Sequence, residues 1–350
     1  MSAPTAPTVL LDQLLRGEPL SGPQAAGLMR GWLDQSIDPA LTGALLAALR
    51  CRGVDGEVLA AMAEELRQAC PLPAGRPELP LVDTCGTGGD GRDTFNISTA
   101  VAFTAAACGA CVAKHGNRSA SGRVGSADVL EALGLPLDSP PSQVMEALPR
   151  ARVTFLFAPG WHPALAPLAP VRRSLGVRTV FNLLGPLVNP LRPEAQVLGV
   201  ARRELLDPMA DALRRLGLAR AVVVHGHDGL DEASLSGPSE VRWVESATVR
   251  SEWIDPAELG LGRATVSDLA GGDVAANAAI LEQVLRGRGR PAQRDVVVLN
   301  PALVLWAAGL VDAVGEGVPL ARRALASGAS WERLETLRGA LAPAAALESG

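Results

Sequence analysis

A glycine-rich segment at residues 83–99 has the composition of a phosphate-binding loop. It lies between the apolar runs 79–82 and 99–107, so we expect it to connect a short buried strand to a buried helix. Asn96 and Ser98 are suitable N-cap residues for that helix, whose amino end carries partial positive charge. Four glycines would expose backbone amides to an anion: Gly86, Gly88, Gly89 and Gly91. A loop that merely turns the chain is the alternative, and the flanking threonines and aspartates disfavour it.

The spacing distinguishes three kinds of phosphate loop. A P-loop is excluded because no Gly-Lys-Ser/Thr follows. The glycines fit the dinucleotide fingerprint, but several polar residues separate them from the helix, and the next strand ends in Lys114 and His115 rather than in an acid for a ribose. Asp90 and Asp93 would repel a bare phosphate, whereas a metal ion would bridge them to it. The sequence therefore favours a highly phosphorylated, metal-bound ligand.

A second polar segment, 112–128, begins at the end of a predicted strand, where open α/β sheets bind ligands. Its cations are Lys114, Arg118 and Arg123. Further donors and small residues are Asn117, Ser119, Ser121, Ser126, Gly116, Gly122 and Gly125. We expect Ser126 to cap the next helix as well. The density of donors favours ligand binding over a solvated basic loop.

Two later segments add groups of opposite charge. Arg172, Arg173 and Arg178 follow residues 158–163, and an arginine fork suits a carboxylate, although a surface ion pair is the default for any single arginine. The apolar run 178–190, with its asparagines and prolines, predicts a rigid wall. Asp231 and Glu232 follow a predicted strand and are candidate ligands for Mg²⁺, which prefers one or two carboxylates plus substrate phosphates. The nearby His225 and His227 are interpreted as structural.

The composition limits the class of protein. The 350 residues are 48% hydrophobic, enough for a large core and two domains. The formal net charge of −5 gives no reason to expect nucleic-acid or membrane binding, and no apolar run reaches the length of a membrane span. The polar N-terminus lacks a signal-peptide pattern, so we expect a cytoplasmic protein whose five cysteines are thiols.

The elements that must position these residues divide into two groups. Residues 9–15, 23–33, 39–49 and 58–66 have helical apolar spacing, and Ser21, Asp38 and Asp55 are candidate caps. After a linker at 71–77, strands are predicted at 79–84, 110–114, 153–157, 195–200 and 220–225. Helices are predicted at 97–108, 126–134, 140–149, 163–175 and 203–217, a hairpin or edge strands at 241–253, and more helices after Asp268.

This alternation predicts an α/β fold class: a small all-helical N-terminal domain at 1–72 and a larger α/β domain at 73–350 with a mostly parallel central sheet. A later helical segment near 163–190 is a candidate addition to the helical domain.

Taken together, the motifs resemble those of the anthranilate phosphoribosyltransferases, which catalyse the second step of tryptophan synthesis. The matching segments are GTGGD at 86–90, NIST at 96–99, KHGNRS at 114–119, GSAD at 125–128, NLLGPL at 182–187 and GLDE at 229–232. They follow the family's order and spacing, and the likeness runs from about residue 10 to 340. Each motif alone is modest, whereas six in register are specific.

The resemblance implies a fold shared with nucleoside phosphorylases, a homodimer formed through the helical part, phosphoribosyl pyrophosphate as donor and anthranilate as acceptor. By position, the donor would contact Gly86, Gly89, Asp90, Thr94, Asn96, Ile97, Ser98, Thr99, Lys114, His115, Gly116, Asn117, Arg118, Ser119, Ser121 and Ser126. Anthranilate would contact Gly86, Asn117 and Arg172. Two Mg²⁺ ions would be held by Ser98, Asp231 and Glu232.

One segment departs from the family pattern. The family usually has Ser-Ser-Lys-Ser before the GSAD motif, whereas this chain has Ser121-Gly-Arg-Val124. Arg123 keeps the positive charge, but Gly122 and Val124 lack hydroxyls that the family has there.

The expected chemistry needs no covalent nucleophile. Lys114, the loop amides and magnesium would neutralise the departing pyrophosphate, while Arg172 and Asn117 would position the arylamine. His115 is the nearest candidate for proton transfer. Two alternatives remain open at this point: a pyrimidine-nucleoside phosphorylase of the same fold, and a non-catalytic relative that binds nucleic acid.

Overall fold

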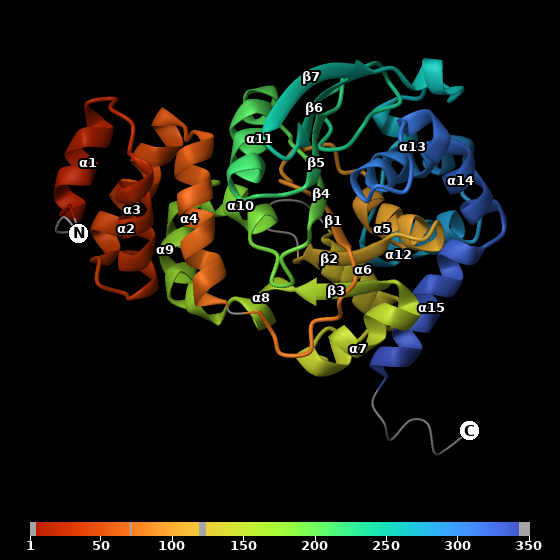
Figure 1. Cartoon of the computed structure of the whole chain (residues 1–350), viewed down its shortest axis with the longest axis horizontal. Coiled ribbons are helices and arrows are strands. Elements are labelled where there is room, and N and C mark those ends of the chain that lie inside the picture. The colour runs from red at the N-terminus through yellow and green to blue at the C-terminus, as the bar shows by residue number, and fades with distance from the viewer. Residues whose placement is uncertain (1–4, 71, 119–123, 343–350) are drawn as a thin grey trace.

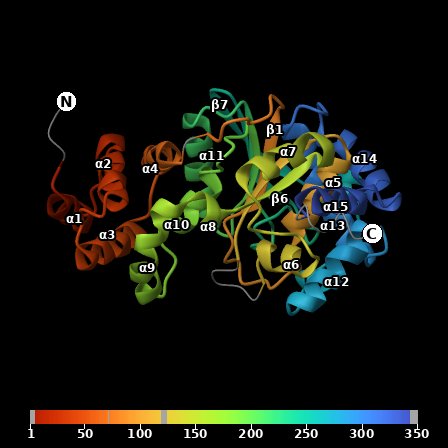
Figure 2. The same cartoon turned by 90° about the horizontal axis from the view of Figure 1, so that it is seen from below.

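The chain forms a helical bundle at one end and an α/β body at the other (Figures 1 and 2). The computed structural model describes residues 5–70, 72–118 and 124–342. Helices α1 and α15 lie at opposite ends in both views, and α8, α9 and α10 lie between the bundle and the sheet. No described helix is long and apolar enough to cross a membrane.

Four helices make the bundle: α1 (Pro7–Leu15), α2 (Gly22–Leu33), α3 (Pro39–Arg52) and α4 (Gly56–Ala69). The three predicted caps are confirmed. Ser21, Asp38 and Asp55 each accept a hydrogen bond from a backbone amide in the first turn of the helix that follows.

A seven-stranded sheet forms the centre of the α/β body, in the order β3-β2-β1-β4-β5-β6-β7. Its strands are β1 (Leu81–Gly86), β2 (Cys111–Gly116), β3 (Val153–Phe157), β4 (Ala195–Gly199), β5 (Arg220–His225), β6 (Ser239–Glu245) and β7 (Thr248–Ile254). The first five are parallel, and β6 and β7 form the predicted antiparallel hairpin. This confirms a mostly parallel sheet. The carboxyl ends of β1 and β2 therefore lie side by side.

Helices cover both faces of the sheet. The longer ones are α5 (Ile97–Ala107), α6 (Ser126–Ala132), α7 (Pro141–Ala151), α11 (Leu206–Arg215), α12 (Val274–Leu285), α13 (Pro291–Ala307), α14 (Val314–Ala326) and α15 (Ala329–Leu341). On β5, Val222 and Val224 belong to the core formed with α5 and α13, whereas Ala221 and Val223 pack toward α11 and the bundle. A strand that is apolar on both faces is the pattern of a covered parallel sheet.

The helices between β3 and β4 are shorter than predicted. The connection between these strands comprises α8 (Ala158–Trp161), a 3-10 segment (Pro163–Leu168), α9 (Ala169–Leu175), α10 (Phe181–Leu184) and a 3-10 turn (Gly185–Leu187). The predicted helix 163–175 is thus split, because Pro167 lacks the amide that a continuous helix needs. Similarly, the predicted helix 203–217 begins as a 3-10 turn (Arg203–Leu205) before α11.

The bundle and this connection share one apolar core. Leu168, Val180 and residues 181–188 pack with the bundle helices, and the Nε of Arg67 on α4 donates to the carbonyl of Leu187 at 2.9 Å. Arg67 is buried, which lowers its pKa to about 10. The packing accords with a contribution of 163–190 to the helical domain, while the boundary at residues 72 and 73 stays a prediction.

We predict that Arg67→Ala lowers the free energy of unfolding by about 2–3 kcal/mol, because it leaves the carbonyl of Leu187 unpaired and removes a buried side-chain stem. Arg30→Ala is the matched control in the same bundle: its exposed guanidinium pairs with Glu65, and we expect a loss below about 1 kcal/mol. Urea denaturation measures both values. Equal losses in the two variants would contradict the role given to Arg67.

Candidate active site

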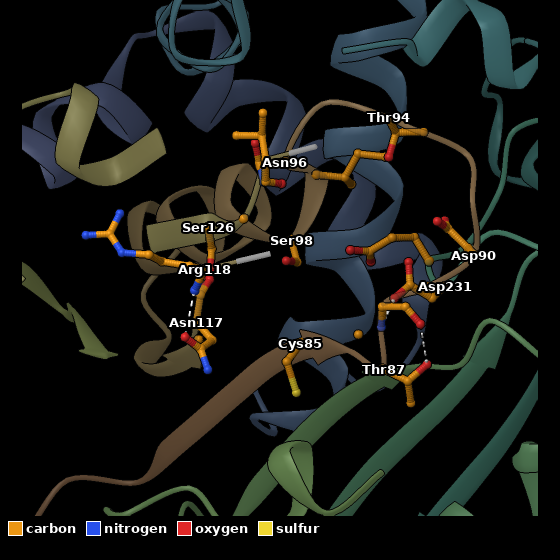
Figure 3. Close-up of a pocket in the computed structure, with 18 of the residues that line it drawn as sticks. Cys85, Thr87, Asp90, Thr94, Asn96, Ser98, Asn117, Arg118, Ser126 and Asp231 are labelled. Atoms are coloured by element: carbon orange, nitrogen blue, oxygen red, sulfur yellow. Dashed lines mark hydrogen bonds between the residues drawn. The ribbon is translucent and has the colours of Figure 1, made fainter. Parts of the chain in front are cut away.

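A cavity of about 400 Å³ lies at the carboxyl ends of β1 and β2 (Figure 3). Its lining includes the glycine loop 86–91, the start of α5, the end of β2, the start of α6, Arg172, Arg178, Asp231 and Glu232. The fold therefore brings together the glycine loop and an acid pair about 145 residues away in the sequence, as the six motifs predict.

The glycine loop has the backbone that its composition predicts. Gly88, Gly89 and Gly91 have φ values of 67°, 77° and 68°, in the left-handed region that favours glycine. The amide of Gly88 donates to Oδ2 of Asp231 at 2.7 Å. The loop is thus fixed to the acidic segment that follows β5.

Two predicted caps behave differently from expectation. Asn96 occupies the N-cap position of α5, but its side chain makes no capping hydrogen bond and donates to the carbonyl of Val124 at 3.2 Å. Ser126 is the first residue of α6 rather than its cap, and its hydroxyl donates to the carbonyl of Asn117. Asp128 instead accepts from the amide of Gly125. The polar side chains of Asn96 and Ser126 thus connect segments of the cavity wall.

Lys114 brings a buried positive charge to the cavity. Its Nζ donates to the carbonyl of Thr84 at 2.8 Å and to Oγ of Ser98 at 3.0 Å. Lys114 is the only lysine in the sequence, against 31 arginines. A compact ammonium has three donors, of which two here reach a strand and the start of a helix.

A buried network beneath Lys114 fixes the strand ends. Asp83 on β1 accepts from the amide of His115 at 3.2 Å and from Nδ2 of Asn189 at 2.9 Å. Asn189 also donates to the carbonyl of Ala113 at 2.7 Å. Burial raises the pKa of Asp83 to about 6, against the opposing effect of Lys114. The motifs do not single out Asp83 or Asn189 as site residues: Asp83 is the first residue of the glycine-rich segment, and Asn189 lies in the apolar run 178–190.

His115 is a poor proton acceptor in this setting. Its Nδ1 is 3.2 Å from the carbonyl oxygen of Gly185, and its ring contacts that of His162 edge-on with centroids 5.2 Å apart. Burial, with a further contribution from His162, lowers the pKa of His115 to about 3. Its role in proton transfer stays a prediction, and the lowered pKa would make the neutral ring a weak proton acceptor.

The acid pair approaches the strand ends very closely. β1 and β4 pair Gly86 with Gly199, and a side-chain carbon at Gly199 would lie 1.6 Å from the backbone oxygen of Asp231. At Gly86 it would lie 2.1 Å from Oδ2 of Asp231. Only glycine at both positions admits the 231–232 segment. Gly199 was not singled out from the sequence, where it is one residue of a predicted strand.

The electrostatics of the acid pair fit a divalent cation. Burial and the neighbouring Asp90 raise the pKa of Asp231 to about 7, and burial and Asp231 raise that of Glu232. Carboxylates that disfavour one another's charge are the donor set that a hard cation stabilises. Among the described residues, no three acidic, histidine or cysteine side chains could hold an ion unaided, so phosphate oxygens would have to complete the coordination.

The arginines occupy different positions. Arg172, on α9, is half-buried with its guanidinium 5.2 Å from the ring centre of Phe181, and burial lowers its pKa. Arg178 donates to the carbonyl of Thr87 at 2.5 Å and lies against Gly89. Arg173 is exposed and does not line the cavity.

Some predicted donor contacts are displaced or undescribed. Arg118 pairs with Asp128 and Glu131, and its guanidinium points away from the other labelled side chains (Figure 3). Thr99 is buried and lies behind the cavity wall. Ser119, Ser121, Gly122 and Arg123 lie outside the described residues. Conversely, the cavity is also lined by residues that were not predicted: Gly271, Gly272 and Asn277, at the start of α12.

Comparisons with known proteins extend over nearly the whole chain. A model described as "Glycosyl transferase family, a/b domain" matches residues 78–331, and one described as "Glycosyl transferase family, helical bundle domain" matches residues 8–70. An anthranilate phosphoribosyltransferase from Parasynechococcus marenigrum (strain WH8102) is 66% identical over 333 residues, which are 95% of this chain and 95% of that protein.

Two solved structures are similar to the whole chain. The crystal structure of the anthranilate phosphoribosyltransferase from Thermus thermophilus has a TM-score of 0.87 and 45% identity, and covers 95% of this chain and 99% of its own. The Saccharomyces cerevisiae enzyme in complex with PRPP and Mg has a TM-score of 0.85 and 27% identity, and covers 96% and 97%.

The depressed pKa of His115 predicts a pH-dependent stability. In the unfolded chain the imidazole binds a proton near pH 6.5, whereas in the folded chain it does so only near pH 3. The free energy of unfolding should therefore fall as the pH falls below 6.5, by up to about 1.4 kcal/mol per pH unit from this group. His115→Asn should reduce the loss between pH 7 and pH 5 by about 2 kcal/mol in urea denaturation.

His227→Asn, which removes an exposed imidazole, is the control and should follow the parent protein. A His115→Asn variant whose stability declines with acid as steeply as the parent's would show that the imidazole is charged in the folded state.

Proposed function

The chain belongs to the anthranilate phosphoribosyltransferases of the glycosyl transferase family, and on this premise we propose that the cavity at the ends of β1 and β2 binds phosphoribosyl pyrophosphate as a magnesium complex beside anthranilate. The enzyme transfers the phosphoribosyl group to the amine of anthranilate, which gives N-(5-phosphoribosyl)anthranilate and pyrophosphate. This is the second step of tryptophan synthesis from chorismate.

One observation carries the assignment of the site: the left-handed glycine loop, the buried Lys114 and the buried acid pair line a single cavity. Backbone amides and an ammonium bind phosphate oxygens, and the acids bind the cation that accompanies them. Neither the phosphate-binding donors nor the cation-binding acids alone specify a diphosphate donor.

We assign the donor to the residues that line this cavity. The residues are Gly86, Gly89, Asp90, Thr94, Asn96, Ile97, Ser98, Lys114, His115, Gly116, Asn117 and Ser126. Arg118 would contribute its backbone and stabilise the end of the loop through its ion pairs with α6, since its guanidinium is turned outward. Thr99 is a buried residue in the first turn of α5 and would support the cavity wall without touching the donor.

Magnesium would be held by Asp231, Glu232 and Ser98, and we propose two ions. The yeast structures that contain Mg support the metal. Three donor side chains with five oxygens are available, and the Ser98 hydroxyl keeps a lone pair besides the one that accepts from Lys114. When bound, the metal would neutralise the negative charge that develops on pyrophosphate.

Arg172, Asn117 and the backbone at Gly86 would position anthranilate. Arg172 lies over Phe181 and next to the cavity, so its fork can bind a carboxylate while its face stacks on the ring. A yeast relative is described in complex with 4-fluoroanthranilate, which has the same carboxylate and amine. Holding the arylamine at the ribose would convert a two-molecule encounter into a step within one complex.

The transfer breaks the bond between C1 of the ribose and the pyrophosphate oxygen, and forms the bond between C1 and the amine nitrogen. Lys114 and the amides of the glycine loop stabilise the departing charge, and their positions are fixed in advance by Thr84, Ser98 and Asp231. We assign no catalytic proton transfer to His115, whose neutral ring shapes the acceptor side of the cavity, so the amine proton leaves to a phosphate oxygen or to water.

Two properties beyond the reaction are also proposed. The enzyme would be a homodimer that pairs through the bundle, where Val9 and Leu15 on α1 are 52% and 72% exposed. It would act in the cytoplasm, in accord with five cysteines that all lie within the described residues and are all free thiols.

The loss of anthranilate fluorescence in the presence of phosphoribosyl pyrophosphate and Mg²⁺ tests the proposal. Asp231→Asn with Glu232→Gln should lower kcat/KM by at least about 100-fold and raise the Mg²⁺ concentration needed for half-maximal rate, because the site then lacks the charge that holds the cation. Glu282→Gln, which removes the charge of a half-buried acid on α12 that pairs with Arg286, is the control and should keep the parent rate.

Two results would count against the assignment. A parent enzyme whose rate does not change across a magnesium titration would exclude a metal-bound donor. A double variant with the parent's magnesium dependence would place the metal elsewhere.

A further inference from the structure

A second cavity, of about 650 Å³, lies on the other side of the glycine loop, between the bundle and the α/β body. Its lining comes from the end of α3 and the turn after it (49–55), from 178–183, and from 201–208. It shares a wall with the first cavity, formed by Thr87, Gly88, Gly89, Arg178 and Asn182. The loop and the side chains of Arg178 and Asn182 therefore separate the two.

This second cavity is positively charged although the chain has a net charge of −5. Four arginines line it, against the two acids Asp55 and Glu204. Asp55 is engaged as the cap of α4, and Glu204 lies 3.3 Å from Arg202. The excess of cations favours an anionic occupant.

The arginines differ in the hydrogen bonds and ion pairs that their guanidinium groups make. Arg52 donates to the carbonyls of Gly17 and Gly53. Arg50, by contrast, makes no hydrogen bond or ion pair through its side chain with any residue that the structure describes. Burial lowers the pKa of Arg178 and Asp231 opposes this effect from the side of the first cavity. Arg202 and Arg50 lower the pKa of Arg178 further, so the positive charges of these two arginines act on it from the side of the second cavity. Arg50, Arg178 and Arg202 thus form one cluster, contributed by the bundle, the connection and the α/β body.

The remaining wall strengthens this cluster. Leu49, Val180, Leu183 and Leu205 are buried apolar residues of the same cavity. An apolar wall lowers the local dielectric, which strengthens the attraction between guanidinium groups and an anion. Guanidinium forks match the oxygens of phosphate groups in geometry as well as in charge.

We propose that the Arg50–Arg178–Arg202 cluster binds a polyphosphate anion, and that its occupant is the pyrophosphate released in the transfer reaction. The inference rests on the proposed function, because the glycine loop between the cavities is the part of the site assigned to the pyrophosphate end of the donor. Gly88 and Gly89 have no side chains, so the loop presents bare backbone to both cavities. Arg178 reaches the loop from the shared wall. The second cavity would thus bind the released pyrophosphate temporarily, outside the catalytic cavity.

Equilibrium dialysis of the full chain with radiolabelled inorganic pyrophosphate tests the proposal. The parent should bind two pyrophosphates per chain, of which saturating phosphoribosyl pyrophosphate with Mg²⁺ displaces one. Arg50→Ala with Arg202→Ala should weaken the undisplaced site at least about tenfold, while the KM for phosphoribosyl pyrophosphate stays within about twofold. Arg50→Lys with Arg202→Lys should weaken the undisplaced site less than the alanine pair does, because the charge is kept although the guanidinium geometry is lost.

Arg250→Ala with Arg263→Ala is the matched control: both arginines are exposed and ion-paired, neither lines the second cavity, and the net charge changes equally. The proposal is overturned if the parent binds a single pyrophosphate that the donor displaces fully, if the control pair weakens binding as much, or if anthranilate displaces the second pyrophosphate. Failure of the proposed function would look different, since the parent would then consume no anthranilate in the fluorescence assay.

Discussion

The close approach of the 231–232 segment to the ends of β1 and β4 is the constraint on which the site depends. Hydrogen bonding in the parallel sheet places Gly86 beside Gly199, and the absence of side chains there lets Asp231 lie against both strand ends. From that position its carboxylate accepts from the amide of Gly88. A single hydrogen bond, from the amide of Gly88 to the carboxylate of Asp231, therefore joins the proposed phosphate loop to the proposed metal site, although about 145 residues separate them in sequence.

Opposite charges are balanced across the cavity rather than paired within it. Burial raises the pKa of both acids, with a further contribution from Asp90 at Asp231 and from Asp231 at Glu232, while Lys114 is held by Thr84 and Ser98. A site with separated acids and cations is suited to a ligand that brings both negative phosphates and positive metal ions.

Sequence patterns predicted the parts that depend on local chemistry. Strands 153–157 and 220–225 coincide with the observed ones, because dense apolar runs bounded by polar residues specify buried strands. The glycine loop and the acid pair were also found. Gly199 and Asn189 were not, because their roles arise from contacts with distant segments. Arg118 was assigned to the ligand from its position in a motif, whereas Asp128 and Glu131 turn it outward.

Turnover and a crystal structure of Gly199→Ala test the central constraint most directly. The added methyl group cannot coexist with the backbone oxygen of Asp231 at 1.6 Å, so the 231–232 segment should move away from the strand ends and kcat/KM should fall at least about 100-fold with the sheet intact. Gly339→Ala, which adds the same methyl group in open space on α15, should keep the parent rate. A Gly199→Ala enzyme with more than half of the parent's kcat/KM and an unmoved Asp231 would contradict the account.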